Sequence, residues 1–159
     1  MSRTVDTNVL VYATHSSSPF HDRALALVEH LVAGPGLAYL FWPAILGYLR
    51  IVTHPNILGS PLSSEDAMSN VAAMIAPPHV RVAGEGTDFW ASFRAIAADV
   101  KPRGNLVPDA HLVALMREHG VSTIWSHDRD LRRFRGITVK DPFSAEHSTG
   151  FEEPYSRSS

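Results

Sequence analysis

Short apolar runs alternate along the chain with longer stretches in which apolar residues recur at every third or fourth position. The short runs are typical of buried strands; they begin at residue 3 and then cover residues 37–42, 80–82, 121–125 and 137–139. The longer stretches are typical of helices, and they begin at Ser18-Pro19, Pro43, Ser63 or Ser64, Thr87 and Pro108. Strands that alternate with helices form a parallel sheet with right-handed crossovers. The pattern therefore predicts an α/β fold with a central, mainly parallel sheet covered by helices on both faces.

Length and composition indicate one domain. The chain has 159 residues, of which 45% are hydrophobic, and it contains no cysteine, which excludes disulfides and thiolate zinc sites and favours the cytoplasm. The longest apolar stretch, residues 37–49, is shorter than the roughly 20 residues of a membrane helix, and no signal peptide is visible. We expect no membrane contact, a folded domain over residues 1–143 and a flexible tail over residues 144–159.

The charge pattern leaves two interpretations open. A formal net charge of −2 argues against a protein that coats nucleic acid through bulk electrostatics. Basic residues nevertheless cluster after Asp128 and before Asp109, namely Arg129, Arg132, Arg133, Arg135 and Lys140 in the first group and Lys101 and Arg103 in the second. They form either a positive rim around an acidic centre or an ordinary solvated face.

Three aspartates lie where a strand is expected to end or a helix to begin. Asp6 follows the first strand, Asp109 follows Pro108 at a helix start, and Asp128 follows the strand at 121–125. A buried carboxylate is costly without a cation or hydrogen-bond donors, and the carboxyl ends of parallel strands open onto one crevice. We therefore expect these three side chains to form one acidic site suited to Mg²⁺, with Mn²⁺ as the other candidate.

The acidic residues also have purely structural interpretations. Asp109 could simply favour the positive end of a helix dipole. Asp128 and Asp130 could cap the short helix that runs through Arg135, and for Asp130 we favour capping. None of the nine histidines has a convincing zinc spacing, so we assign no catalytic role to histidine.

Three further polar residues are weaker candidates for site support. Ser126 could hydrogen-bond a metal ligand or the backbone at its strand end, and Asn8 could orient Asp6 or close a turn. Arg50 could contact a nucleic acid, pair with a site carboxylate, or form a surface ion pair of little energetic value.

Four segments together resemble the PIN-domain ribonucleases, and within them the VapC toxins of bacterial VapBC toxin-antitoxin pairs. These segments are Val5-Asp6-Thr7-Asn8-Val9-Leu10, Leu49-Arg50-Ile51-Val52-Thr53-His54-Pro55, Gly104-Asn105-Leu106-Val107-Pro108-Asp109-Ala110-His111-Leu112 and Ser126-His127-Asp128-Arg129-Asp130-Leu131. The resemblance covers residues 3–143 and implies a PIN-like three-layer α/β/α sandwich. It also implies a metal-dependent endoribonuclease that cleaves tRNA or rRNA, with Asp6, Asp109 and Asp128 as catalytic Mg²⁺ or Mn²⁺ ligands. A VapB-type antitoxin and a second copy in a homodimer are the implied partners.

The chain departs from the family pattern at Gly47, three residues before Arg50, where PIN domains of this kind usually carry a glutamate. Glycine in a helix costs about 1 kcal/mol relative to alanine, so we expect another chain or a ligand to approach closely there. Asp130 is the nearest substitute carboxylate. The departure also keeps an alternative function open, a catalytically weakened PIN-like module that only binds RNA.

Overall fold

A single parallel sheet forms the centre of the computed structural model, which describes residues 2–147 and 150–151. Its strand order is β3-β2-β1-β4-β5, and every neighbouring pair of strands is parallel. The strands are β1 (Arg3–Val5), β2 (Ala38–Phe41), β3 (Val80–Ala83), β4 (Thr123–Trp125) and β5 (Thr138–Lys140). The predicted α/β fold with a mainly parallel sheet is confirmed.

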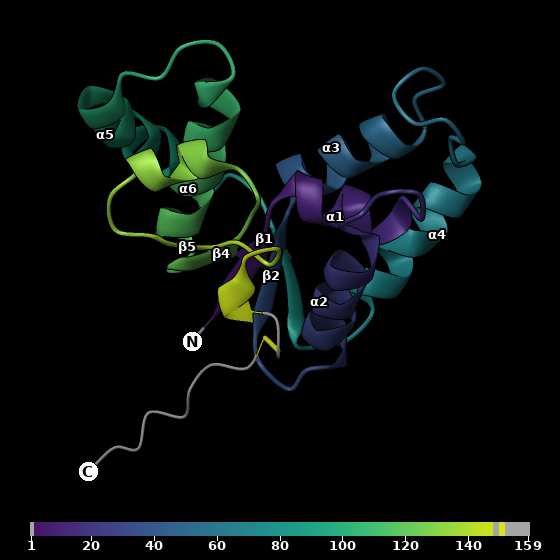
Figure 1. Ribbon diagram of the computed structural model, residues 1–159. Coiled ribbons are helices and arrows are strands. Elements are labelled where there is room, and N and C mark those ends of the chain that lie inside the picture. The colour runs from purple at the N-terminus through teal and green to yellow at the C-terminus, as the bar shows by residue number, and fades with distance from the viewer. Residues whose placement is uncertain (1, 148–149, 152–159) are drawn as a thin grey trace.

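Helices cover both faces of this sheet (Figure 1). On one face lie α1 (Thr7–Thr14), α2 (His21–Ala33), α3 (Trp42–Val52) and α4 (Ser64–Ile75). On the other face lie α5 (Phe89–Val100) and α6 (Leu106–Glu118), and two short 3-10 helices follow, η1 (Arg129–Arg133) and η2 (Ala145–His147). The architecture is the expected three-layer α/β/α sandwich.

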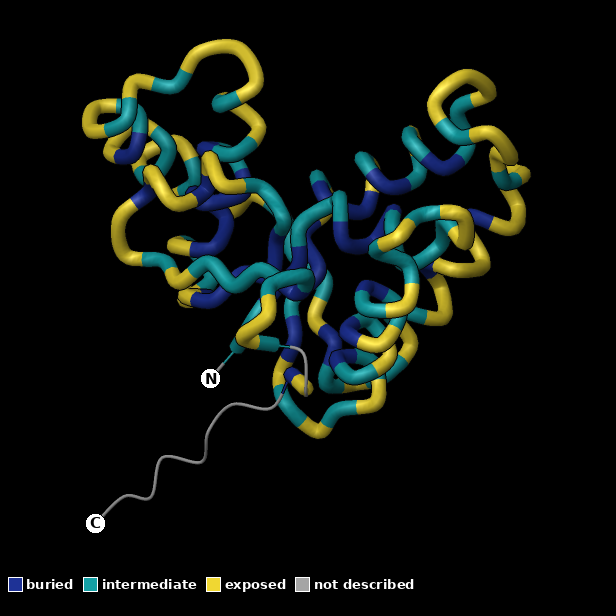
Figure 2. The backbone as a smooth tube through the Cα atoms, in the orientation of Figure 1, coloured by how far each residue is buried: buried dark blue, intermediate teal, exposed yellow. Residues whose placement is uncertain are grey.

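Two hydrophobic cores separate the three layers because neighbouring side chains of a strand point to opposite faces. Leu40 packs into the core beneath α1–α4, whereas the next residue, Phe41, packs into the core beneath α5 and α6. In the same way, Trp125 packs into the core beneath α1–α4 and Ile124 into the core beneath α5 and α6. Figure 2 shows the buried chain concentrated along the sheet, with exposed segments at the periphery.

The helices differ from the sequence prediction in one missing element and in several starting residues, for example α2, which begins at His21 and not at Pro19. The sequence pattern did not predict α1, whose buried residues Val9, Leu10 and Val11 form a short, largely β-branched run that is equally typical of a strand. Helix α6 begins at Leu106, two residues before the predicted start at Pro108. Pro108 is tolerated there because the first-turn amides of a helix have no partner within the helix.

Part of the C-terminal segment packs against the domain. Phe151 is 6% exposed, its ring centroid lies 5.3 Å from that of Trp125, and the Arg23 guanidinium carbon lies 4.5 Å from the Phe151 ring centroid. The rest of the expected flexible tail, residues 148–149 and 152–159, lies outside the described residues. Within the described part of the chain, no helix is both long and apolar enough to cross a membrane.

Candidate active site

A pocket of about 460 Å³ opens where β1 and β4 end, between α1 and α3 on one side and the start of α6 on the other. Its walls include the three predicted aspartates, which come from chain segments more than 100 residues apart at the extremes. The lining residues are Asp6, Thr7, Asn8, Val11, Tyr12, Pro43, Gly47, Arg50, Ile51, Pro108, Asp109 and Asp128. The sheet topology therefore brings the predicted site residues together, as expected for the carboxyl edge of a parallel sheet.

Asp6 both ends β1 and caps α1. The Thr7 backbone N–H donates to Asp6 Oδ1 at 2.7 Å, and the Ser126 hydroxyl donates to Asp6 Oδ2 at 2.8 Å. Burial raises the pKa of this carboxyl, the hydrogen bonds from Ser126 and Thr7 oppose that rise, and the charge of Asp128 adds to it. Each carboxylate oxygen keeps a further lone pair, so Asp6 can still accept a cation on its pocket side.

Asp109 lies in the first turn of α6, where its carboxyl faces three other acids. Burial, as the largest cause, and the charges of Asp128, Asp6 and Asp130 together raise its pKa to about 7. A cation bound beside Asp109 would offset the repulsive part of this shift. The folded chain therefore places Asp109 where a bound cation would be favourable.

Asp128 and Asp130 both lie at the start of η1, and one of them caps it. Asp128 is the residue that caps η1, because its Oδ1 accepts from the Asp130 backbone N–H at 2.9 Å. The capping role favoured for Asp130 is therefore wrong. The Asp130 carboxylate instead joins those of Asp109 and Asp128 in a group in which one oxygen of each residue lies within 4.8 Å of the others, and Arg133 Nε lies 3.7 Å from Asp130 Oδ1.

Ser126 connects the two strand ends. Its buried hydroxyl, besides donating to Asp6, accepts from the Asp128 backbone N–H at 2.9 Å and from Asn8 Nδ2 at 3.3 Å. Asn8 Oδ1 in turn accepts from the His127 backbone N–H at 3.4 Å. Ser126 therefore hydrogen-bonds the proposed ligand Asp6 and the Asp128 backbone. Asn8 contacts Ser126 and the loop that carries Asp128.

Thr7 fills the space beside Gly47. A Cβ atom at Gly47 would lie 3.0 Å from Thr7 Oγ1 and 3.1 Å from Thr7 Cγ2, and that hydroxyl donates to the Ala44 carbonyl at 3.3 Å. The close approach that we expected from another chain or a ligand therefore comes from α1 of the same chain. Any side chain at this position has to displace Thr7.

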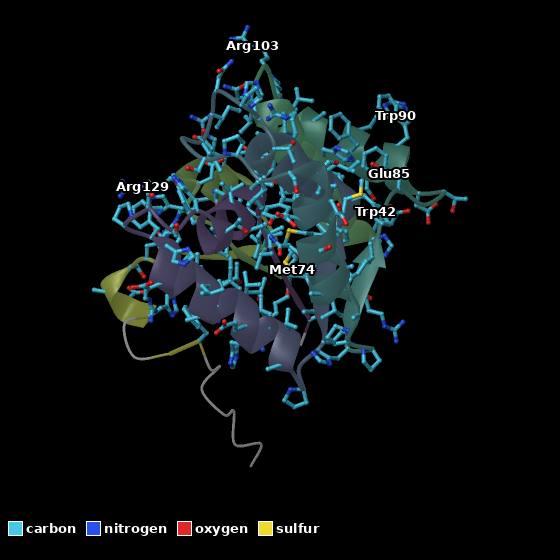
Figure 3. The ribbon with its side chains drawn as sticks, turned by 90° about the vertical axis from the view of Figure 1, so that its right-hand side faces the viewer. Trp42, Met74, Glu85, Trp90, Arg103 and Arg129 are labelled. Carbon is cyan, nitrogen blue, oxygen red and sulfur yellow. The ribbon has the colours of Figure 1, made fainter. Side chains whose placement is uncertain are left out.

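The basic residues lie on the surface around the site. Arg50 lines the pocket, is exposed, and has no ion pair within residues 2–147 and 150–151, so the surface ion-pair interpretation is wrong for it. Arg103 and Arg129 project from the molecule at different positions, the first at the top and the second at the left of Figure 3. Arg135, in contrast, lies 3.9 Å from Asp99 and forms part of an ordinary surface pair.

The sequence analysis missed a contact that fixes the loop around Asp128. His127 Nδ1 lies 3.0 Å from Asp141 Oδ2, and the His127 ring packs against Phe20 and Phe143, with centroid distances of 4.9 and 5.1 Å. The position of His127 directly before Asp128 is the only sequence signal for this role. The C-terminal strand region thereby supports the loop.

The donor set suits a hard divalent cation. The described residues contain one group of three potential ligands close enough to share an ion, and all three are aspartates. Carboxylate oxygens are the ligands that Mg²⁺ and Mn²⁺ prefer, whereas zinc sites usually include histidine or cysteine. The residues present therefore fit Mg²⁺ or Mn²⁺.

Comparison with known proteins places this chain in one family. The PIN domain family model matches residues 4–137. The chain is also 62% identical over 144 residues to ribonuclease VapC48 of Mycobacterium tuberculosis, an alignment that covers 91% of this chain and 99% of that protein. The chain belongs to the PIN-domain family and, within it, to the VapC family.

Solved structures show the same fold at low sequence identity. The crystal structure of Mycobacterium tuberculosis VapC20, described as a sarcin-ricin loop cleaving toxin, matches with a TM-score of 0.61 at 16% identity, covering 82% of this chain and 92% of that one. VapBC2 from Rickettsia felis, bound to a DNA fragment from its promoter, matches with a TM-score of 0.59 at 13% identity, covering 88% of this chain and 98% of that one.

Proposed function

We propose that this protein is a toxin that hydrolyses RNA phosphodiester bonds with the help of Mg²⁺ or Mn²⁺. The observation that carries the proposal is the convergence of Asp6, Asp109 and Asp128 in one pocket, where the pKa of Asp109 is raised to about 7. Family membership and the name of the relative VapC48 support the same activity.

Four acidic residues would supply the ligands for the ion. Asp109, Asp128 and Asp130 offer the oxygens that lie closest together, and Asp6 offers the fourth carboxylate from the end of β1. A bound divalent ion would activate the attacking water and stabilise charge on the phosphate in the transition state. Ser126 fixes Asp6 and the Asp128 backbone, which keeps the ligands in place through the reaction.

Asp130 is proposed to replace the glutamate that the family usually carries at the position of Gly47. Its carboxylate lies in the same group as those of Asp109 and Asp128, although it comes from η1 and not from α3. Thr7 meanwhile occupies the space next to Gly47. The acidic centre thus keeps four carboxylates with a changed arrangement.

The proposed partners are an antitoxin, an RNA and a second copy of the chain. A VapB-type antitoxin would cover the pocket and place a basic side chain against the aspartates, and the VapBC2 complex supports such a partner. Structured tRNA or rRNA in the cytoplasm is the proposed substrate, since VapC20 is described as cleaving an RNA loop. The homodimer remains a proposal that rests on family membership.

Cleavage of total RNA by the purified protein tests this function. We expect a few discrete cuts with Mg²⁺ or Mn²⁺ and none with chelator. Asp128→Asn should abolish the cuts, whereas Glu65→Gln, which removes an exposed acid on α4, should leave them unchanged. Intact RNA with both metals, together with retained RNA binding, would instead identify the catalytically weakened binding module that Gly47 makes conceivable.

A further inference from the structure

A second open hollow lies between the end of α5 and the start of α6. It has a volume of about 670 Å³, within the range of small-ligand pockets, and its walls are Phe93, Ala97, Lys101, Pro102, Arg103 and Val107. Figure 3 shows Arg103 projecting at the top of the molecule and Trp90 projecting from the same upper region. Nothing in the proposed hydrolysis uses these residues.

This hollow adjoins the acidic pocket along the chain. Val107 lines the hollow, and the next two residues, Pro108 and Asp109, line the acidic pocket. All three belong to the first turn and a half of α6, so the two concavities lie on either side of one short piece of helix. A single-stranded polynucleotide that passes over the start of α6 can therefore reach both the acidic pocket and this hollow.

One wall of the hollow offers an aromatic surface. The lining ring, Phe93, is half-buried and packs partly against the core; it also stacks against Trp90, which lies outside the hollow's lining and is 65% exposed, with centroids 5.8 Å apart and ring planes at 11°. Val107 adds apolar surface at 42% exposure. Unpaired bases stack on such rings whatever their identity.

Two of the residues that line the hollow are cations. The side chains of Lys101 and Arg103 are exposed, and neither has an ion-pair or hydrogen-bond partner within the part of the chain that the structure describes. Phosphate oxygens are the complementary ligands for such groups. The cations also offset the repulsion that a polyanion meets as it approaches the carboxylates of the acidic pocket.

We infer that this hollow is a second RNA subsite, which binds a single-stranded nucleotide adjacent to the phosphate that is cleaved. Phe93 stacks on the base, and Lys101 and Arg103 hold the neighbouring phosphates. The inference rests on the proposed ribonuclease function and adds the strand path and the single-stranded character of the substrate. An isologous contact between two copies across the hollow is disfavoured, because it would bring together the unpaired cations of both copies.

The test measures RNA binding and cleavage by the full-length protein. The probe is a short single-stranded RNA that carries a fluorescent label for anisotropy, and a second version contains 2-aminopurine for stacking. Arg103→Gln is compared with Arg81→Gln, which removes an exposed cation from the edge strand β3. Phe93→Leu keeps an apolar side chain and removes the ring. A thermal-unfolding curve first shows that this variant is folded, and its RNA binding is then compared with that of the wild-type protein.

We expect Arg103→Gln to weaken RNA binding several-fold, to raise KM with little change in kcat, and to reduce the salt slope of binding by about one. Phe93→Leu should weaken binding about fivefold or more and abolish quenching of 2-aminopurine. Behaviour of Arg103→Gln like that of Arg81→Gln would overturn the inference, as would a change in oligomeric mass on either substitution in the hollow. A wild-type protein that neither binds nor cleaves RNA would instead overturn the proposed function itself.

Discussion

Ser126 at the end of β4 donates a hydrogen bond to Asp6 at the end of β1, with 2.8 Å between Oγ and Oδ2. The same hydroxyl accepts from the Asp128 backbone N–H at 2.9 Å. One buried side chain therefore fixes the positions of two proposed metal ligands that are far apart in the sequence. Outer contacts of this kind commonly change metal affinity by about 10- to 100-fold when they are removed.

Replacing Ser126 by alanine should weaken metal binding by about tenfold or more, because Asp6 loses its donor and the Asp128 amide loses its acceptor. Calorimetric titration with Mn²⁺ measures this change, and Ser126→Thr should restore most of the affinity. Ser122→Ala, an exposed position just before β4, serves as the control. Equal Mn²⁺ affinity in Ser126→Ala and wild-type protein would show that the hydroxyl does not position the ligands.

Introducing the missing glutamate should not improve this enzyme. Gly47→Glu places a Cβ about 3.0 Å from Thr7 Oγ1, so Thr7 has to shift and the protein should lose stability. The double variant Thr7→Ala/Gly47→Glu should recover part of that loss, with a coupling on the order of 1 kcal/mol in thermal unfolding. Additive effects of the two substitutions, or faster RNA cleavage by Gly47→Glu alone, would contradict this explanation.

Removing the charge of Asp109 should stabilise the metal-free protein at neutral and higher pH. The pKa of Asp109 is about 7 in the folded chain and 3.8 for the unperturbed group, so the folded state binds more protons between these values. The contribution of this group to stability consequently decreases as pH rises from about 4 to about 7. Thermal unfolding in chelator should show that the Tm of Asp109→Asn exceeds that of the wild type by an increasing margin across this window. A margin that does not vary with pH would refute the raised pKa.

Phe151 should contribute to stability although it lies in a polar segment. It packs against Trp125 and beneath Arg23, so Phe151→Ala should cost on the order of 3 kcal/mol and lower the Tm by roughly 5 °C or more. Met68→Ala, at a 59% exposed position on α4, should change the Tm little. If both variants unfold at the wild-type temperature, the C-terminal segment does not stabilise the domain.

The alternation of apolar runs was enough to predict the layers and the parallel sheet, because burial on both faces of a strand leaves a clear sequence pattern. It did not predict α1. Val9, Leu10 and Val11 have the composition of a strand, and they form a helix because Asp6 caps it and the helix packs against α2 and α3. Tertiary packing overrides local preference at this position.

The three aspartates could be predicted as site residues because each lies at the end of a strand or the start of a helix. In a parallel sheet those ends meet at the carboxyl edge of the sheet. The role of Asp130 could not be predicted, because in Asp128-Arg129-Asp130 either acid could cap the short helix. Only the position at which η1 begins shows that Asp128 is the cap. The fit of Thr7 against Gly47 also depends on how two helices cross. Gly47 indicated a close approach from the sequence, but only the packing of α1 against α3 identifies Thr7 as the group that approaches.

The backbone beside the acidic residues belongs to the centre of the sheet. Val5 pairs with Trp125, the Asp6 N–H donates to the Trp125 carbonyl at 3.0 Å, and the Ser126 N–H donates to the Lys140 carbonyl at 2.9 Å. Amides in such a central ladder exchange with deuterium only when the whole domain opens, whereas the outer helices exchange through local fraying. Fraying of the outer helices thus leaves the ends of β1 and β4 in place, so Asp6 and Ser126 keep their positions while Asp109, on α6, moves with its helix.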